Sequence, residues 1–487
     1  MIKFVFAVFL SLSALNSFLN VAQADISWQG RYRASYNYIT DPSLSGDGSD
    51  KNYFLHHLVL TPKIILADGF ELISTLDILN NGDYAVVGSQ AGQSLGSGGS
   101  KPANTFYGSD GSPALADNQI GNVRDANIRE FYLVYKHAGG RFKLGRAPLH
   151  FGLGINLNNG QGAFDHYFDN RDMVSYEVLF GGMKFQPYIA RITDGFNSSG
   201  NAANELGLIA DWDKKDSGLK LGLLGLIRHV PGSLNNNQVS TSGAADFQRY
   251  GVYVERVNTK DSDFRYALEL GLNSGKLGLN STGKEIKYSG LGLAFEMDYF
   301  TPVRGLKMGL KSGYAAGADA SKDDNFSAFA FDRNYDVGML LFNHPMGNKN
   351  LDLFSSTAFG RQGANFGSGY QPNQSIDSET VANSIYVAPY ISYDVDAKWN
   401  ITSSLLWAQL ENTNVNSPFF STTSNLIVDR DLGFEVDFAL TYKPFKLLTW
   451  ETRLGGFFPG KAFEGGSQNF DTKNVIGGVS RISLSFE

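Results

Sequence analysis

Charged side chains recur at every second position along several otherwise apolar segments of this chain. Arg31 and Arg33 form such a pair near the start. Lys307 and Lys311 in the middle are four residues apart and so fall on the same alternate positions. Residues two apart project to the same side of an extended chain. Charges of both signs that face one aqueous passage create a field that orders water and steers ions. The spacing therefore predicts a polar passage lined by charged groups.

The candidate pore-lining residues share this alternate spacing. They are Arg31, Arg33, Glu71, Asp77, Arg265, Glu269, Glu296, Asp298, Lys307, Lys311, Glu435, Asp437, Glu451, Arg453 and Arg481. If the first and last segments pair, Arg31, Arg33, Arg453 and Arg481 form one basic patch that attracts anionic groups on a solute. The alternative is a polar lining without selectivity, in which each arginine pairs with a neighbouring carboxylate.

Residues 150–172 combine glycines, aromatic residues and acids in one compact segment. A loop of this composition that folds into the passage would narrow it. The candidate constriction residues are His150, Asn158, Asp165, Asp169, Arg171 and Asp172. Two alternatives stay open: an external lid, or a Ca²⁺ site on the three aspartates, because hard cations prefer several oxygen ligands.

Enzyme classes find little support in the sequence. None of the seven histidines lies in a recognisable nucleophile motif, and the absence of cysteine excludes disulfides and thiolate metal sites. The net charge of −7 argues against a nucleic-acid partner, which needs a basic face. We therefore expect no enzymatic activity, no metal and no cofactor.

The elements that carry these residues alternate with period two. In Ile26–Tyr38, Trp28, Tyr32, Tyr36 and other apolar residues alternate with polar ones. Segments of about ten residues of this kind, joined by short turns and long loops in alternation, are typical of outer-membrane barrels. No apolar stretch long enough for a membrane helix follows the N-terminal region. A membrane crossing then requires a closed barrel, which satisfies every backbone group.

Eight short turns and nine long loops predict 18 antiparallel strands, with 16 as the fallback. The short turns are expected at 67–69, 137–140, 181–182, 213–217, 258–262, 301–305, 394–398 and 444–447. The long loops are expected at 40–51, 80–126, 150–172, 194–204, 230–247, 274–286, 317–379, 411–430 and 459–473. Both termini fall on the short-turn side, which predicts short periplasmic turns and long extracellular loops. Within 317–379, the apolar stretch Tyr335–Phe342 is either an extra strand or part of a folded lid.

Residues 1–24 have the features of a secretory signal peptide. Lys3 precedes an apolar stretch, and Ala22-Gln23-Ala24 offers a cleavage site, so that residues 25–487 form the barrel domain. The last strand ends at Phe486 and resembles the signal read by the barrel-insertion machinery, although Glu487 follows it. Tryptophans near the short turns predict an aromatic belt in contact with outer-membrane lipid and lipopolysaccharide. A homotrimer is one oligomeric state that the sequence leaves open.

Two segments carry a family resemblance. Trp28-Gln29-Gly30-Arg31-Tyr32-Arg33-Ala34 and Leu144-Gly145-Arg146-Ala147-Pro148-Leu149-His150-Phe151-Gly152 resemble porin-like barrels of the alginate-export type. The resemblance implies an 18-stranded passive channel with a basic lumen. Gln usually follows the Gly-Arg in that family, whereas Ala147 stands here, and the predicted lumen is mixed in charge. We carry over the architecture and leave the polysaccharide substrate aside.

The sequence thus predicts an integral protein of the bacterial outer membrane. Its expected function is passive diffusion of small hydrophilic or anionic solutes through a water-filled lumen. The alternatives are a surface recognition or adhesion barrel and a polysaccharide export channel.

Overall fold

The computed structural model describes most of the expected barrel domain. It covers residues 25–81, 123–191, 204–230, 243–354 and 380–486, except 47, 49, 68, 79, 125–126, 166–167, 215, 258–262, 281, 333, 349–350 and 417–424. The predicted signal peptide and most of the predicted loop 80–126 lie outside these residues. Within the described ranges, no helix is long and apolar enough to span a membrane.

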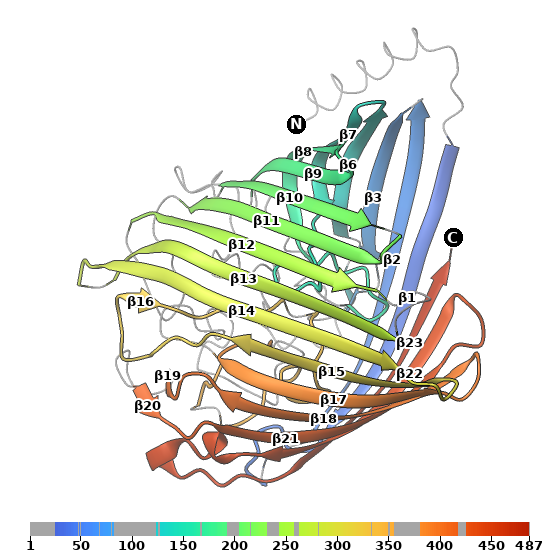
Figure 1. The fold of residues 1–487 in the computed structure, drawn as a ribbon. Coiled ribbons are helices and arrows are strands. Elements are labelled where there is room, and N and C mark those ends of the chain that lie inside the picture. Colours follow the sequence, from blue (N-terminus) through green and yellow to red (C-terminus); the bar gives the residue numbers. More distant parts are fainter. Residues whose placement is uncertain are drawn as a thin grey trace.

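A closed antiparallel barrel of 18 strands forms the body of the molecule (Figure 1), which confirms the predicted fold class. The strands are β1 (Asp25–Ile39), β2 (Lys51–Ala67), β3 (Phe70–Ile78), β6 (Asn127–His137), β7 (Gly140–Pro148), β8 (Asn170–Phe180), β9 (Met183–Arg191), β10 (Asn204–Lys214), β11 (Leu219–Val230), β12 (Ala245–Arg256), β13 (Phe264–Leu279), β14 (Glu285–Phe300), β15 (Leu306–Ala315), β17 (Ser384–Asp394), β18 (Trp399–Leu410), β21 (Asp431–Tyr442), β22 (Leu448–Pro459) and β23 (Val475–Phe486).

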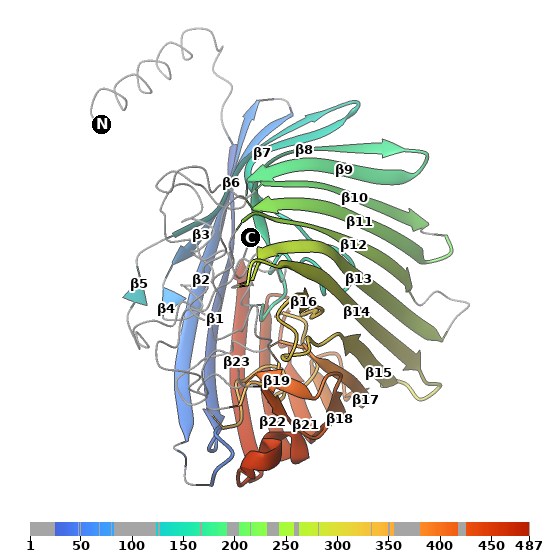
Figure 2. The ribbon, with the colours of Figure 1, turned by 90° about the vertical axis from the view of Figure 1, so that its left-hand side faces the viewer.

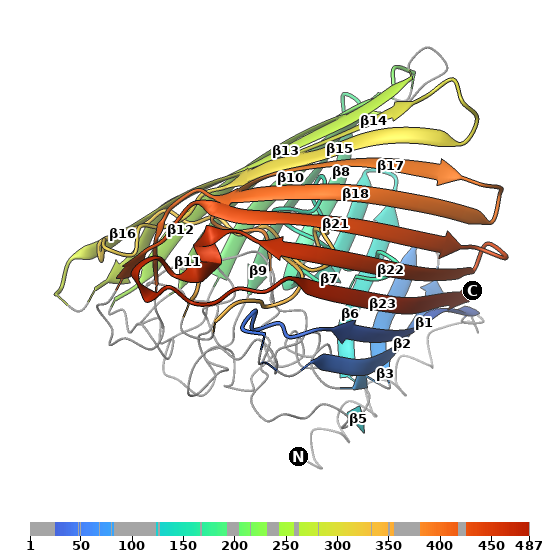
Figure 3. The same cartoon turned by 90° about the horizontal axis from the view of Figure 1, so that it is seen from below.

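The first and last strands close the ring. β1 pairs with β23 from Gly30 opposite Phe486 to Ile39 opposite Gly477, and Figure 3 shows these two strands side by side. Closure matters because an open edge would leave backbone groups unpaired in lipid. The short turns lie at the end of the barrel where β1 begins and β23 ends, as predicted.

Smaller elements belong to the loops at the other end. β4 (Asn80–Asn81) pairs with β5 (Val123–Arg124), and β19 (Asn414–Asn416) with β20 (Asn425–Ile427). β16 (Asn325–Phe326) runs parallel to β14, and Figure 2 shows it between the green and red strands. Two 3₁₀ turns, Lys461–Glu464 and Gly466–Gln468, precede β23.

The predicted bounds of the loop at 274–286 and the strand alternative for Tyr335–Phe342 are wrong. The loop predicted at 274–286 spans only 280–284, because β13 and β14 extend farther than the composition indicated. The stretch Tyr335–Phe342 is no strand: it consists of turns and irregular chain. Its apolar side chains, including Leu340, Leu341 and Phe342, are buried with Leu406 and Phe457 of the barrel wall.

The apolar core therefore lies inside the ring. One cluster joins residues of the 316–354 loop to inward side chains of β14, β17, β18 and β22. A second cluster joins Phe151 and Leu157 to inward side chains of β8–β12. Many large apolar side chains on the opposite faces of the strands are exposed, for example Leu223, Ile391 and Phe438. Exposed apolar residues on the outside and packed loops on the inside are the arrangement expected of a lipid-embedded barrel.

A close approach between wall and loop gives a test of this packing. A Cβ at Gly290 of β14 would lie 2.5 Å from the backbone carbonyl oxygen of Ala328. Because backbone cannot rotate away like a side chain, Gly290→Ala should displace the loop and cost about 1–3 kcal/mol. The matched control is Gly225→Ala, whose new Cβ would have no atom within 4 Å. Urea unfolding in detergent should show a lower midpoint for Gly290→Ala alone, and equal midpoints would contradict the packing.

Candidate functional site

The described strands turn the predicted lining residues toward the inside of the barrel. The burial pattern of β1 places Arg31 and Arg33 on the inner face, whereas Trp28, Tyr36 and Tyr38 are exposed on the outer face. The same alternation turns Arg265 and Glu269 of β13 inward. It also turns inward Glu71, Glu296, Asp298, Lys307, Lys311, Glu435, Asp437, Glu451, Arg453 and Arg481. The side chain of Asp77 lies outside the described part of the structure.

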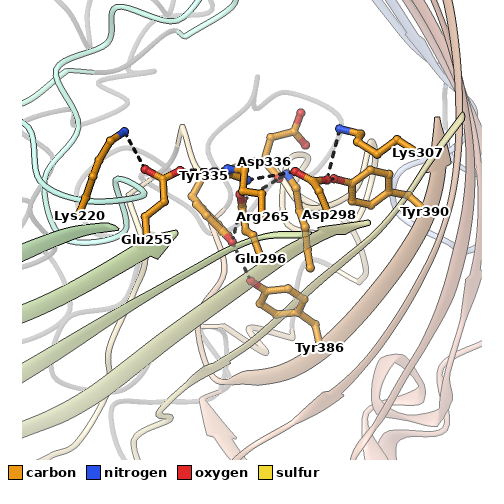
Figure 4. A network of polar contacts seen from close by, with 11 residues as sticks. Lys220, Glu255, Arg265, Glu296, Asp298, Lys307, Tyr335, Asp336, Tyr386 and Tyr390 are labelled. Carbon is orange, nitrogen blue, oxygen red and sulfur yellow. Dashed lines mark hydrogen bonds and ion pairs between the residues drawn. The ribbon is translucent and has the colours of Figure 1, made fainter. Parts of the chain in front are cut away.

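A row of alternating charges crosses neighbouring strands on one inner wall (Figure 4). Lys220 of β11 contacts Glu255 of β12 at 2.9 Å, and Glu255 accepts a hydrogen bond of 3.0 Å from Arg265. Arg265 reaches Glu296 at 3.4 Å and Asp298 at 3.3 Å, and Lys307 reaches Asp298 at 3.3 Å. Tyr390 of β17 ends the row with a hydrogen bond to Asp298. The row lies within a few residues of the short turns, and its cations are partly exposed.

Two smaller charge clusters lie on other strands of the barrel. Lys63 and Lys136 both contact Glu71, at 3.1 Å and 2.6 Å. Arg141 and Lys143 both contact Glu177. Apart from Glu71, none of these residues is among those predicted from the sequence. The alternation of each strand identifies them once the strand boundaries are known.

The four predicted patch arginines do not stack on one another; each is held by another group. Arg481 pairs with Glu451 at 2.6 Å, and its guanidinium lies 4.1 Å from the ring centre of Phe164. Arg453 pairs with Asp336 at 2.6 Å. Arg31 and Arg33 donate to backbone carbonyl oxygens of residues 160–162 and 165. Arg33 also contacts the ring of His57, which therefore faces inward.

The predicted constriction segment folds into the barrel and crosses its interior. Its tip contacts Arg31 of β1 and Arg481 of β23. Its other side contacts Glu269 of β13, whose carboxylate accepts hydrogen bonds from the backbone amides of Gly154 at 2.9 Å and Asn156 at 3.1 Å. A single segment can reach the same face of strands so far apart around the ring only from inside. His150, at the start of this segment, is exposed.

The base of the segment is closed by two hydrogen bonds between Asn158 and Asp169. The amide of Asp169 donates to the carbonyl of Asn158 at 2.6 Å, and the amide of Asn158 donates to the carboxylate of Asp169 at 2.9 Å. Asp165 accepts a hydrogen bond of 2.7 Å from the amide of Gly162. Residues 158 and 169 therefore define a loop whose tip, Gln161 to Ala163, is exposed.

The predicted segment extends too far at its C-terminal end. Arg171 and Asp172 belong to β8, because the ladder with β7 begins at Pro148 opposite Asn170. Arg171 is buried and contacts Glu205, which also holds Arg228. Asp172 pairs with Arg146 at 2.7 Å. The three aspartates of the Ca²⁺ alternative thus have separate partners, and no described group of three acids or histidines is arranged to hold a metal ion.

A second infolded segment, residues 334–348, is fastened to β21. Backbone amides of Met339, Leu340 and Leu341 donate to the carboxylate of Glu435 at 2.5, 2.8 and 2.7 Å. Asp437 accepts a further hydrogen bond of 3.1 Å from Met339. Glu435, Asp437 and Glu269, predicted as open pore lining, are therefore covered by loops.

The side chain of Asp336 anchors the same segment electrostatically. Burial opposes its charge, but the guanidinium of Arg453 and the ammonium of Lys311 hold the pKa of Asp336 well below its ordinary value. A lowered pKa keeps the ion pair with Arg453 intact at neutral pH and down to strongly acidic conditions. The Lys311 ammonium also donates to the backbone carbonyl of Asp336 at 2.7 Å.

The two segments meet inside the barrel. The amide of Asp332 donates to the carbonyl of Ile155 at 3.0 Å, and Arg249 of β12 donates to the carbonyl of Asn156 at 3.2 Å. The half of the interior near the long loops is therefore occupied by packed chain, whereas the half near the short turns carries the charge clusters.

Comparisons with known proteins agree with this geometry at the level of fold. No protein-family model and no curated protein matches the sequence. Among solved structures, a BenF-like porin from Pseudomonas fluorescens Pf-5 is similar at a TM-score of 0.50 and 9% identity, covering 95% of this chain and 98% of that chain. OccK9 (OpdG) of Pseudomonas aeruginosa gives a TM-score of 0.50 at 13% identity, with the same coverage. The chain thus has the fold of outer-membrane porins.

Proposed function

We propose that this protein is an integral outer-membrane channel through which small hydrophilic solutes, anions above all, diffuse passively. The observation that carries the proposal is an excess of cations in two of the three charge clusters near the short turns. Two clusters pair two cations with one carboxylate, on Glu71 and on Glu177. The row of Figure 4 is balanced, with Lys220, Arg265 and Lys307 joined to the carboxylates of Glu255, Glu296 and Asp298.

This local excess does not follow from overall composition, because the whole chain carries a net charge of −7. Several of the cations are accessible to water; Lys136, Arg141 and Lys220 are each at least 40% exposed. Cations on an aqueous wall raise the local concentration of anions and lower the barrier to their passage. The infolded segments disfavour the export of long polysaccharide chains, because they cross the lumen.

Finer features of the sequence prediction support the same picture and stay proposals. The exposed apolar outer face would contact lipid and lipopolysaccharide. The last strand, which ends at Phe486, would be recognised by the insertion machinery, and residues 1–24 would direct export. A trimer and the absence of enzymatic activity are further proposals of the same standing.

Ion selectivity tests the proposed function. We expect the purified protein to conduct in planar bilayers and to favour anions over cations at low salt. Arg31→Ala combined with Arg33→Ala should lower the ratio of anion to cation permeability, because both guanidiniums lie on the inner wall beside the loop tip. High salt should mask the difference, since it screens charges over a few ångströms.

The matched control removes the same amount of charge elsewhere. Lys276→Ala combined with Lys322→Ala changes two exposed lysines that pair with Glu285 and Asp319 in the long-loop region. This control should keep the selectivity of the wild type. A protein that inserts but conducts no ions would contradict the channel proposal, and an unchanged ratio in the arginine variant would assign Arg31 and Arg33 a structural role only.

A further inference from the structure

Glu435 and Asp437 form an acid pair beneath the second infolded segment. They are two residues apart on β21, face inward, and are 0% and 4% exposed. Both carboxyl groups accept a hydrogen bond from the same backbone amide, that of Met339, at 2.5 Å and 3.1 Å. Two carboxyl groups that accept from one amide lie close together, and a proton on one of them removes the repulsion between two buried like charges.

The charged groups around the pair do not remove the need for this proton. Arg453 lies on β22, which pairs with β21, but it is held by Asp336 of the infolded segment at 2.6 Å. Lys311 of β15 contacts Glu296 and the backbone of Asp336. Two buried carboxylates this close repel each other when both are ionised, so the pair titrates as one system and favours a state with one shared proton.

We propose that Glu435 and Asp437 share one proton, and that this proton positions residues 334–348 against the wall of the channel. With the proton present, the pair carries one negative charge and accepts the amides of Met339, Leu340 and Leu341. Without it, two like charges face each other beside the negative Asp336, and the hold on the segment weakens. The inference rests on the proposed function, because it assigns these two residues to positioning the narrowed part of that channel.

The first infolded segment provides an internal comparison. Glu269 is also fully buried and accepts hydrogen bonds from Gly154, Ile155 and Asn156. Among the described residues, no second carboxyl group shares these donors. An alkaline release is therefore expected of the second segment and not of the first.

Single-channel recording at about pH 7 and about pH 9.5 tests the proposal, because alkali favours loss of the shared proton. We expect the wild-type single-channel current to change between conductance levels severalfold more often at the higher pH. Asp437→Asn supplies a permanent amide donor to Glu435 and should abolish this pH response. Glu269→Gln, the control, should keep it. A wild type with equal step frequency at both pH values, or an Asp437→Asn variant with the wild-type response, would overturn the proposal.

Two further arms keep the test decisive. If Asp437→Asn does not fold, Glu435→Gln replaces it, since it removes the same second ionisation. If the wild type conducts no ions at all, the channel proposal fails, and limited proteolysis of the folded protein then tests the acid pair alone. Cleavage within 334–348 should accelerate at alkaline pH in the wild type but not in the variant, and equal acceleration in both would overturn the inference.

Discussion

Replacing residues 159–163 by a Gly-Gly link should raise the single-channel conductance severalfold. The tip removed, Gln161 to Ala163, is exposed and contributes nothing to the apolar core. It lies beside Arg31, which donates to the carbonyl oxygen of Gln161 at 3.0 Å. The base of the loop keeps the two hydrogen bonds between Asn158 and Asp169. The change therefore widens the passage and leaves the packed part of the loop in place.

The control applies the same Gly-Gly replacement to residues 281–283, in the turn between β13 and β14. That turn joins two wall strands at the long-loop end, so its shortening should leave the conductance near the wild-type value. Both variants should show the same shift between heated and unheated samples on gels, which reports an intact barrel. Equal conductance in the tip variant and the wild type would place the narrowest part of the passage elsewhere.

The wall of the barrel follows from sequence because its pattern is set by local geometry. A strand in lipid must expose apolar side chains at every second position, and the opposite face is then free to carry charge. Residues such as Arg31, Glu296 and Lys307 could thus be placed on the inner face without knowledge of any contact. The short turns were found for a similar reason, since Gly, Asn, Asp and Pro mark them locally.

The interior could not be predicted in the same way. The apolar stretch Tyr335–Phe342 is compatible with a strand or with part of a folded lid, and the structure excludes the strand because the stretch packs inside against Leu406 and Phe457. One signal was available: a loop that carries Phe326, Phe329 and Phe331 is too apolar to lie in water and must bury itself.

The buried acids show a second limit. Strand alternation turned Glu269 and Glu435 inward, but their partners are backbone amides about a hundred residues away along the chain. Backbone amide donors cannot be recognised from the amino-acid composition. The sequence therefore could not distinguish an acid that lines a water-filled lumen from one that holds a loop.

Glu269→Ala should release the first infolded segment while the barrel stays closed. The substitution removes the acceptor of three backbone amides and of the Asn156 side chain, which donates at 2.7 Å. Each buried donor left without a partner costs about 1–3 kcal/mol. The wall strands β12, β13 and β14 keep their full ladders, because none of these bonds belongs to the sheet. The loss should therefore concentrate in residues 150–169.

Three measurements separate loop release from barrel damage. We expect noisy, larger currents from Glu269→Ala, faster proteolysis within residues 150–169, and a nearly unchanged heat shift on gels. Glu269→Gln, which retains one acceptor oxygen of the same reach, should show a smaller effect on all of them. If the alanine variant conducts as quietly as the wild type, the segment is held by its contacts with Arg31, Arg249 and Asp332 instead. If the Glu269→Ala variant becomes noisy and also loses its heat shift on gels, Glu269 supports the wall of the barrel itself. The division between a rigid wall and separately fastened loops would then be wrong.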